Sequence, residues 1–143
     1  MLLYMKNKKK ICFEIMAIVL IAIFCISLTP KTLQNDTYYT IKIGEHIIEN
    51  GGIDMMDPFS WHEGLEYTYP HWLYDVIIYS IYSVGGMAGI YISTCVFSVL
   101  LGIAVFKTNS KLTKNQVISF VITLGAMYLL KDYITARAQL VTF

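Results

Sequence analysis

The sequence NDTYYTIKIGEHIIENGGIDMMDPFSWHEGLEYTYPHWLYD, residues 35–75, is the one long polar segment of a chain that is otherwise rich in apolar runs. It contains all three histidines, both tryptophans and eight of the ten acidic residues. One apolar run precedes it, at residues 11–28, and two follow it, at residues 87–106 and 117–130. Any chemistry that this protein performs is therefore expected within residues 35–75.

Charged residues make up only 15% of the 143 residues, whereas about a quarter is usual in soluble domains. The apolar runs are near the length of about 20 residues that a membrane-spanning helix needs. The composition therefore predicts an all-α integral membrane protein with three spans, at residues 11–28, 86–106 and 115–131. The cysteines all lie inside apolar runs, so they indicate neither a disulfide framework nor a metal site.

The lysines predict the orientation of the chain in the cell membrane. Residues 1–10 contain four lysines and residues 107–114 contain three, and neither segment has an acid. Basic segments stay in the cytoplasm under the positive-inside rule, so the acidic loop at residues 29–85 is expected outside. These clusters are too short to indicate nucleic-acid binding. A basic segment before residues 11–28 is also typical of a signal peptide, but no A-x-A-like site follows, which favours an uncleaved anchor.

Two interfacial helices are expected in the outer loop. Over residues 37–50, isoleucines share one side of a helical wheel and charged residues share the other, as in an interfacial amphipathic helix. Asn35 or Asp36 is expected to cap its start, and Gly51 to end it. A second helix, at residues 71–84, would reach only about 21 Å, so we expect it to lie at the interface and to bend at Gly85-Gly86.

Several strings in this region resemble the first outer loop of bacterial polytopic glycosyltransferases of the GT-C type. They are Asn35-Asp-Thr-Tyr-Tyr-Thr-Ile-Lys-Ile-Gly44, Ile47-Ile-Glu-Asn-Gly51, Asp57-Pro-Phe-Ser60, His71-Trp72-Leu73 and Gly85-Gly-Met-Ala-Gly89. The likeness covers roughly residues 33–106, and Arg137-Ala-Gln139-Leu140 looks like a further piece, without the proline expected beside the glutamine. Two departures stand out: that missing proline, and the absence of a second acid beside Asp36.

The resemblance implies an inverting transfer of a sugar from a polyprenyl-phosphate donor to an acceptor on the outer face. By position, Asp36 would act on the acceptor hydroxyl as base or orienting group. Arg137 would pair with the donor phosphate, and Asp57, His71 and Trp72 would contact substrate. No cofactor is implied with certainty, and a divalent metal stays open because relatives often carry a second acid. Residues 132–143 are expected to lead to a fourth span in a longer enzyme, so this part alone would be inactive.

Simpler interpretations accompany each candidate. Asp36 can be a helix cap, Asp57 a turn residue and Arg137 an ordinary outer-loop charge. The histidines match no ligand spacing and the aromatic residues are typical of a belt at the membrane surface. The alternative function is a non-catalytic membrane protein, either a subunit with a larger membrane partner or a gene remnant. A transporter fragment is less favoured because no span carries a charge near its middle.

Overall fold

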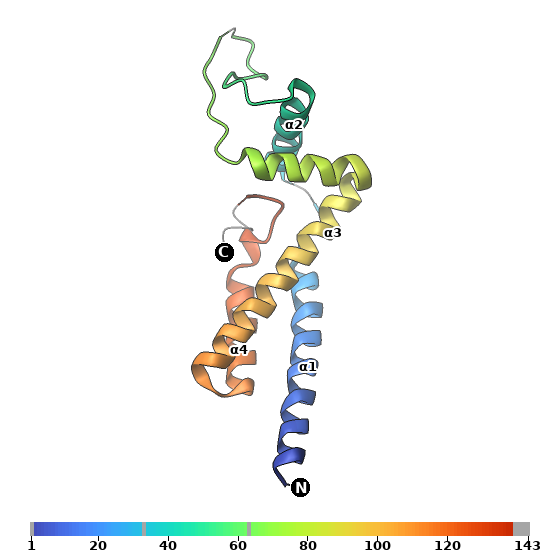
Figure 1. The fold of residues 1–143 in the computed structure, drawn as a ribbon, viewed down its shortest axis with the longest axis vertical. Helices are drawn as coiled ribbons and strands as arrows, with labels where there is room; N and C mark the ends of the chain where they lie inside the picture. Colours follow the sequence, from blue (N-terminus) through green and yellow to red (C-terminus); the bar gives the residue numbers. More distant parts are fainter. Residues whose placement is uncertain (1, 33, 63, 139–143) are drawn as a thin grey trace. The chain divides into compact units, whose positions relative to one another are not determined.

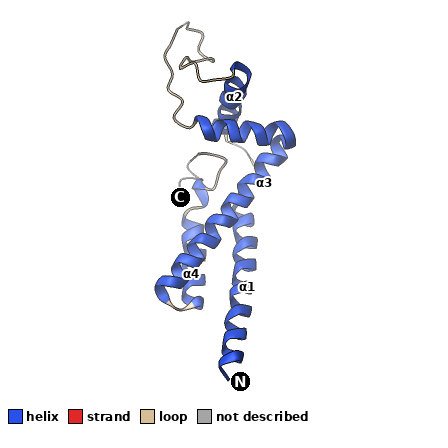
Figure 2. Ribbon diagram, in the orientation of Figure 1, coloured by secondary structure: helices blue, strands red, loops and turns tan. Residues whose placement is uncertain are grey.

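The computed structural model describes residues 2–32, 34–62 and 64–138 and shows a helical protein (Figure 1). The helices are α1 (Leu2–Leu28), α2 (Asn35–Asn50), α3 (Trp72–Thr113) and α4 (Gln116–Leu129), followed by a short 3₁₀ helix, η1 (Lys131–Tyr133). Figure 2 shows no strand in these described ranges. The prediction of an all-α chain is confirmed.

The chain divides into two compact units. The first unit comprises residues 2–31 and 94–135, and the second comprises residues 32–93 and 136–138. Helix α3 begins in the second unit and ends in the first. The two units are described in turn.

In the first unit, α1, the end of α3 and α4 pack around a buried apolar cluster. Its members are Ala17, Ile21, Cys25, Phe106, Met127 and Ile134. Gly102 of α3 lies close to α1, because a Cβ there would lie 2.7 Å from the Cys25 Sγ. Small residues at helix contacts let backbones approach in this way.

Two of the described helices are long and apolar enough to cross a membrane. They are α1, over Lys10–Leu28, and α3. Helix α4 has 14 residues and is only about 21 Å long, less than the roughly 30 Å of a bilayer core. The two long helices are compatible with a membrane protein, but α4 does not have the length that was predicted for a third span.

Helix α3 is interrupted at Gly86, whose φ of 57° and ψ of −151° are not helical. A positive φ suits glycine, which has no Cβ to clash with the backbone. The predicted bend at Gly85-Gly86 is therefore confirmed, and it separates residues 72–85 from the apolar segment at residues 86–106.

The basic segments are more helical than expected. Helix α3 continues to Thr113, so the prediction of a loop over residues 107–114 is wrong, and the connection to α4 is Lys114 and Asn115. Likewise, α1 begins at Leu2, so the residues predicted as a basic tail form its first turns. Lysine is a good helix former, which explains why charge alone did not end these helices.

In the second unit, α2 packs against the first part of α3. Ile41 is buried with Ile78, Ile90 and Ala136, and a second cluster contains Ile43, Ile47 and Tyr69. The opposite side of α2 is exposed, as Lys42 shows, so the predicted amphipathic pattern is confirmed. Ile48, expected on the apolar side, is 46% exposed.

The predicted C-terminal end of α2 is confirmed, but the predicted N-terminal cap is not. Gly51 adopts a left-handed φ of 67° and its N–H donates to the Ile48 carbonyl at 3.3 Å, as expected of a C-terminal glycine. At the start, Gln34 is the capping residue and makes no side-chain cap bond. The prediction that Asn35 or Asp36 caps the helix is wrong, since both lie within its first turn.

Candidate functional site

The structure brings together two predicted site residues that are distant in sequence, Asp36 and Arg137. The Arg137 Nη2 lies 2.6 Å from the Asp36 Oδ2, and the two side chains are 38% and 63% exposed. Asp36 lies in the first turn of α2, and Arg137 follows η1. The candidate base and the candidate phosphate-binding residue are therefore neighbours.

Buried contacts next to this ion pair hold the two segments together. Thr37 is fully buried, and its hydroxyl donates to the Ala136 carbonyl at 3.3 Å. Ala136 packs in the cluster that contains Ile41. An exposed ion pair contributes only about 0.2–1 kcal/mol, so these buried contacts, more than the charges, set the position of Arg137 beside α2.

One donor of Arg137 is unused. Its Nε is buried and has no hydrogen-bond partner among the described residues. A guanidinium has five N–H donors, and a buried donor without a partner destabilises the protein by about 1–3 kcal/mol. An anion that reached this nitrogen would remove that cost.

Aromatic side chains lie one turn beyond Asp36. Tyr39 packs edge-on against Phe59, with ring centroids 5.5 Å apart, and against Tyr67, at 6.3 Å. Burial, followed by a hydrogen bond with Tyr67, raises the pKa of Tyr39 above its ordinary value. Because residues three apart share a helix face, these rings and the Asp36 carboxylate lie on the same side of α2.

Asp57 lies beside this aromatic group and forms a turn. Its Oδ1 accepts the backbone N–H of Phe59 at 2.9 Å, which is the Asx-turn arrangement. Its own N–H donates to the Leu65 carbonyl at 2.9 Å. Its charge also contributes to the raised pKa of Tyr39. The geometry accounts for Asp57 as a turn residue at the edge of the site.

His71 and Trp72 lie at the start of α3. The His71 carbonyl accepts the backbone N–H of Asp75 at 3.0 Å, and the Trp72 side chain is 47% exposed. The described contacts join neither residue to Asp36 or Arg137. Their predicted substrate contacts stay predictions.

Asp75 is a buried acid that the sequence analysis did not single out. It is 8% exposed and lies in the first turn of α3, before the break at Gly86 and so outside residues 86–106. Burial raises the pKa of its carboxyl to about 6, while His71 and a hydrogen bond from Thr40 favour the charged form. Asp75 lies four residues after His71, on the side of α3 that faces α2. This spacing was the sequence feature that could have indicated its burial.

A second polar group fastens the loop between α2 and α3. The His46 Nε2 lies 3.1 Å from the Asp54 Oδ2. The single proton of the Tyr69 hydroxyl is shared between the Asp54 Oδ1, at 3.1 Å, and the Met56 carbonyl oxygen, at 2.6 Å. The loop also contains one isolated antiparallel bridge, between Met56 and Glu66. These contacts indicate a structural role for His46.

No group of three or more histidine, cysteine, aspartate or glutamate side chains in the described chain is arranged to hold a metal ion. Asp36 is paired with a guanidinium, which competes with a cation for the carboxylate. Gln139 and Leu140, the other residues of the Arg137 string, lie outside the described residues.

Comparisons with known proteins identify no family for the chain. No protein-family model matches it, and no curated protein and no solved structure shows significant similarity.

Proposed function

We propose that this chain is the N-terminal part of a membrane glycosyltransferase that moves a sugar from a polyprenyl-phosphate donor to an acceptor on the outer face. The observation that carries the proposal is the pairing of Asp36 with Arg137, together with the buried Nε of Arg137, which has no hydrogen-bond partner among the described residues. The two helices of membrane-spanning length are compatible with a lipid-linked substrate.

The proposed reaction needs a carboxylate and a cation close together. The acceptor hydroxyl gives its proton to the Asp36 carboxylate as its oxygen forms a bond to the anomeric carbon of the sugar. The bond from that carbon to the phosphate oxygen breaks, and polyprenyl phosphate leaves with both bonding electrons. Arg137 neutralises the charge of the leaving phosphate, for which a planar guanidinium is well suited.

Donor binding would also prepare Asp36 for this role. In the structure, the carboxylate is paired with the Arg137 Nη2. A donor phosphate that binds the free Nε competes for the same guanidinium and releases the carboxylate to the acceptor. The rings of Tyr39, Phe59 and Tyr67, which pack together, offer apolar faces to a sugar. No step of the proposed reaction uses a metal ion.

Replacement of Asp36 with Asn tests the proposal in membranes that contain the full-length protein and a polyprenyl-phosphate sugar. Loss of a general base lowers rates by about 100- to 10,000-fold, so we expect transfer to fall by that amount while membrane insertion is unchanged. Glu49→Gln is the matched control, since Glu49 is an exposed acid on the same helix. Normal transfer by Asp36→Asn would sink the assignment.

The second candidate is a non-catalytic subunit of a larger membrane partner. The hydrogen bond from Thr37 to Ala136 favours it, because this bond joins the same two segments as the neighbouring ion pair. In this interpretation, the ion pair only stabilises the fold. In that case, Asp36→Asn would lower stability without changing any transfer activity, and the protein would co-purify with a polytopic partner.

A further inference from the structure

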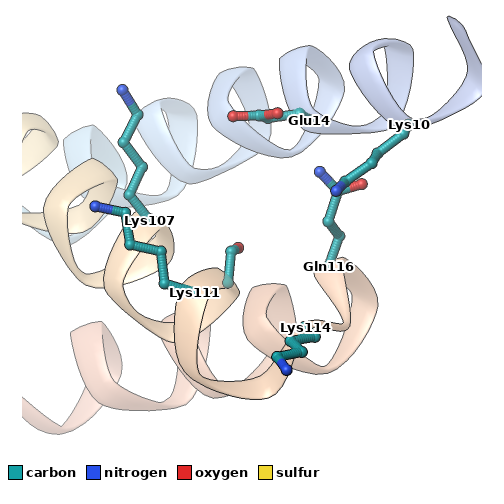
Figure 3. A pocket seen from close by; sticks show the side chains of 7 residues that line it. Lys10, Glu14, Lys107, Lys111, Lys114 and Gln116 are labelled. Carbon is teal, nitrogen blue, oxygen red and sulfur yellow. The ribbon is translucent and has the colours of Figure 1, made fainter. Parts of the chain in front are cut away.

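A basic pocket lies in the first unit, where the start of the apolar part of α1 meets the turn between α3 and α4. It has a volume of about 560 Å³ and is lined by Lys10, Glu14, Lys107, Ser110, Lys111, Lys114 and Gln116. Figure 3 shows side chains from α1 and from the α3–α4 turn around this hollow. Four lysines against one glutamate give the lining a formal charge of +3.

The spacing of these residues places them on one side of each helix. Lys107, Ser110 and Lys111 are three and four residues apart in α3, so they share one face of that helix. Lys114 follows the end of α3, in the turn to α4. Lys10 and Glu14 are four residues apart on α1, so they also share a face. None of the four lysines forms an ion pair with another described residue. Only Glu14 offsets the four lysines, so the lining keeps a net positive charge.

A second observation points to a ligand. Ser110 is one of the lining residues, and its Oγ is buried and has no hydrogen-bond partner among the described residues. Lysines near a helix C-terminus are favourable simply because of the helix dipole. The dipole does not account for Lys10, which comes from another helix, or for a buried hydroxyl without a partner. An anion with several acceptor oxygens accounts for both.

The surroundings of the pocket indicate an amphipathic anion. Lys10 is the first residue of the apolar segment Lys10–Leu28, and Lys107 follows the apolar run of α3. Beside the lining residues of α1, Ile11 and Ile15 are 57% and 59% exposed. Charged side chains at the end of apolar helices, with exposed apolar side chains next to them, suit a molecule that has an anionic head and apolar chains.

We infer that this pocket is a phosphate-binding site for the headgroup of an anionic phospholipid. On binding, the flexible lysine side chains turn their ammonium groups toward the phosphate, the Ser110 hydroxyl donates to one of its oxygens, and the acyl chains lie along the exposed isoleucines of α1. The site is separate from Asp36 and Arg137 and does not depend on the proposed transferase activity.

Binding of a fluorescent short-chain phosphatidylglycerol to the purified protein in zwitterionic detergent tests the site. Removal of one lysine charge near a headgroup is expected to weaken binding about fivefold, so Lys111→Gln should show this loss and Lys111→Arg should not. Lys31→Gln is the matched control, because Lys31 is an exposed lysine of the same unit outside the pocket. An equal loss in Lys31→Gln would mean attraction to general surface charge and would overturn the inference.

Ser110→Ala separates a ligand contact from a structural effect. Removal of the unpartnered hydroxyl should leave the thermal stability of the lipid-free protein unchanged or higher, yet weaken phosphatidylglycerol binding by about tenfold. Unchanged lipid affinity in this variant would contradict the role of Ser110.

Two further ligands identify the source of the phosphate. Phosphatidylcholine should bind more weakly than phosphatidylglycerol, and equal binding would overturn recognition by charge. Inorganic phosphate should compete only weakly. If it bound as tightly as phosphatidylglycerol, with the same dependence on Lys111, the phosphate site would stand but the lipid headgroup would be the wrong source.

Discussion

The packing of α2 on α3 makes a sharp prediction at Gly44. A Cβ at this position would lie 2.2 Å from the Asp75 carbonyl oxygen and 2.7 Å from the Tyr79 Cβ. Because the nearest atom belongs to backbone, it cannot rotate away, and Gly44→Ala must push the two helices apart. Overpacking of this kind usually destabilises by about 1–3 kcal/mol, and a rigid backbone neighbour favours the upper end.

The helix propensity of alanine acts in the opposite direction. Glycine is about 1 kcal/mol less favourable than alanine inside a helix, so we expect a net loss of about 2 kcal/mol for Gly44→Ala. For a unit of this size, 1 kcal/mol corresponds to roughly 4–8 °C in the unfolding midpoint, which makes the expected decrease on the order of 10 °C.

Thermal unfolding in mild detergent, followed by tryptophan fluorescence, measures this loss. Both tryptophans, Trp61 and Trp72, lie in the second unit, so their emission reports on the unit that contains Gly44. Gly85→Ala is the matched control, because Gly85 also lies in a helix of the second unit but a Cβ there would meet nothing within 4 Å. If Gly44→Ala were as stable as the wild type, the close packing of α2 against the start of α3 would be refuted.

Three further predictions concern the loop and its supports. The pKa of Asp75 is about 6 in the folded protein, against 3.8 for a free carboxyl, so the folded state binds more protons than the unfolded state between these values. The free energy of unfolding should therefore fall as pH rises from about 4 to about 6. Asp75→Asn should remove this pH dependence, measured by fluorescence-detected unfolding, and the same dependence in the variant as in the wild type would contradict the prediction. Tyr69→Phe removes the contacts of the hydroxyl with Asp54 and Met56 and should destabilise the loop by about 1–2 kcal/mol. The expected result is faster proteolysis between α2 and α3. An unchanged cleavage rate would show that other contacts stabilise the loop. Asp57→Asn keeps an oxygen that can accept the Phe59 N–H, so its rate of proteolysis should stay within about twofold of the wild-type rate. Asp57→Ala lacks this oxygen and should be cleaved faster. Equal cleavage rates for the two variants would show that this hydrogen bond does not stabilise the loop.

The local patterns of the sequence predicted the local structure well. Ile41, Ile43 and Ile47 of α2 are buried as predicted, because a period of 3.6 residues fixes which side chains share a helix face. The break at Gly86 could be predicted because only glycine adopts its backbone conformation readily. The extent of the helices was harder to predict, since lysines at residues 107–111 favour helix as much as loop.

The assembly of the site could not be predicted from local patterns. Thr37 and Ala136 are 99 residues apart in sequence, and no periodicity relates them. Asp36 and Arg137 were both candidates, but their pairing depends on this tertiary contact. The burial of Asp75 was missed for the same reason, because it depends on Gly44 admitting the backbone of α3.

The most direct test of the proposed role of Asp36 is the transfer rate of the charge-swapped protein, Asp36→Arg with Arg137→Asp. Each single replacement breaks the ion pair, while the double replacement restores it with the charges exchanged, and unfolding midpoints verify that the pair has re-formed. If Asp36 acts on the acceptor and Arg137 on the donor phosphate, the double variant should recover stability and still transfer sugar at least 100-fold more slowly than wild type. Recovery of transfer together with stability would show that the pair only holds the fold, and would contradict the account.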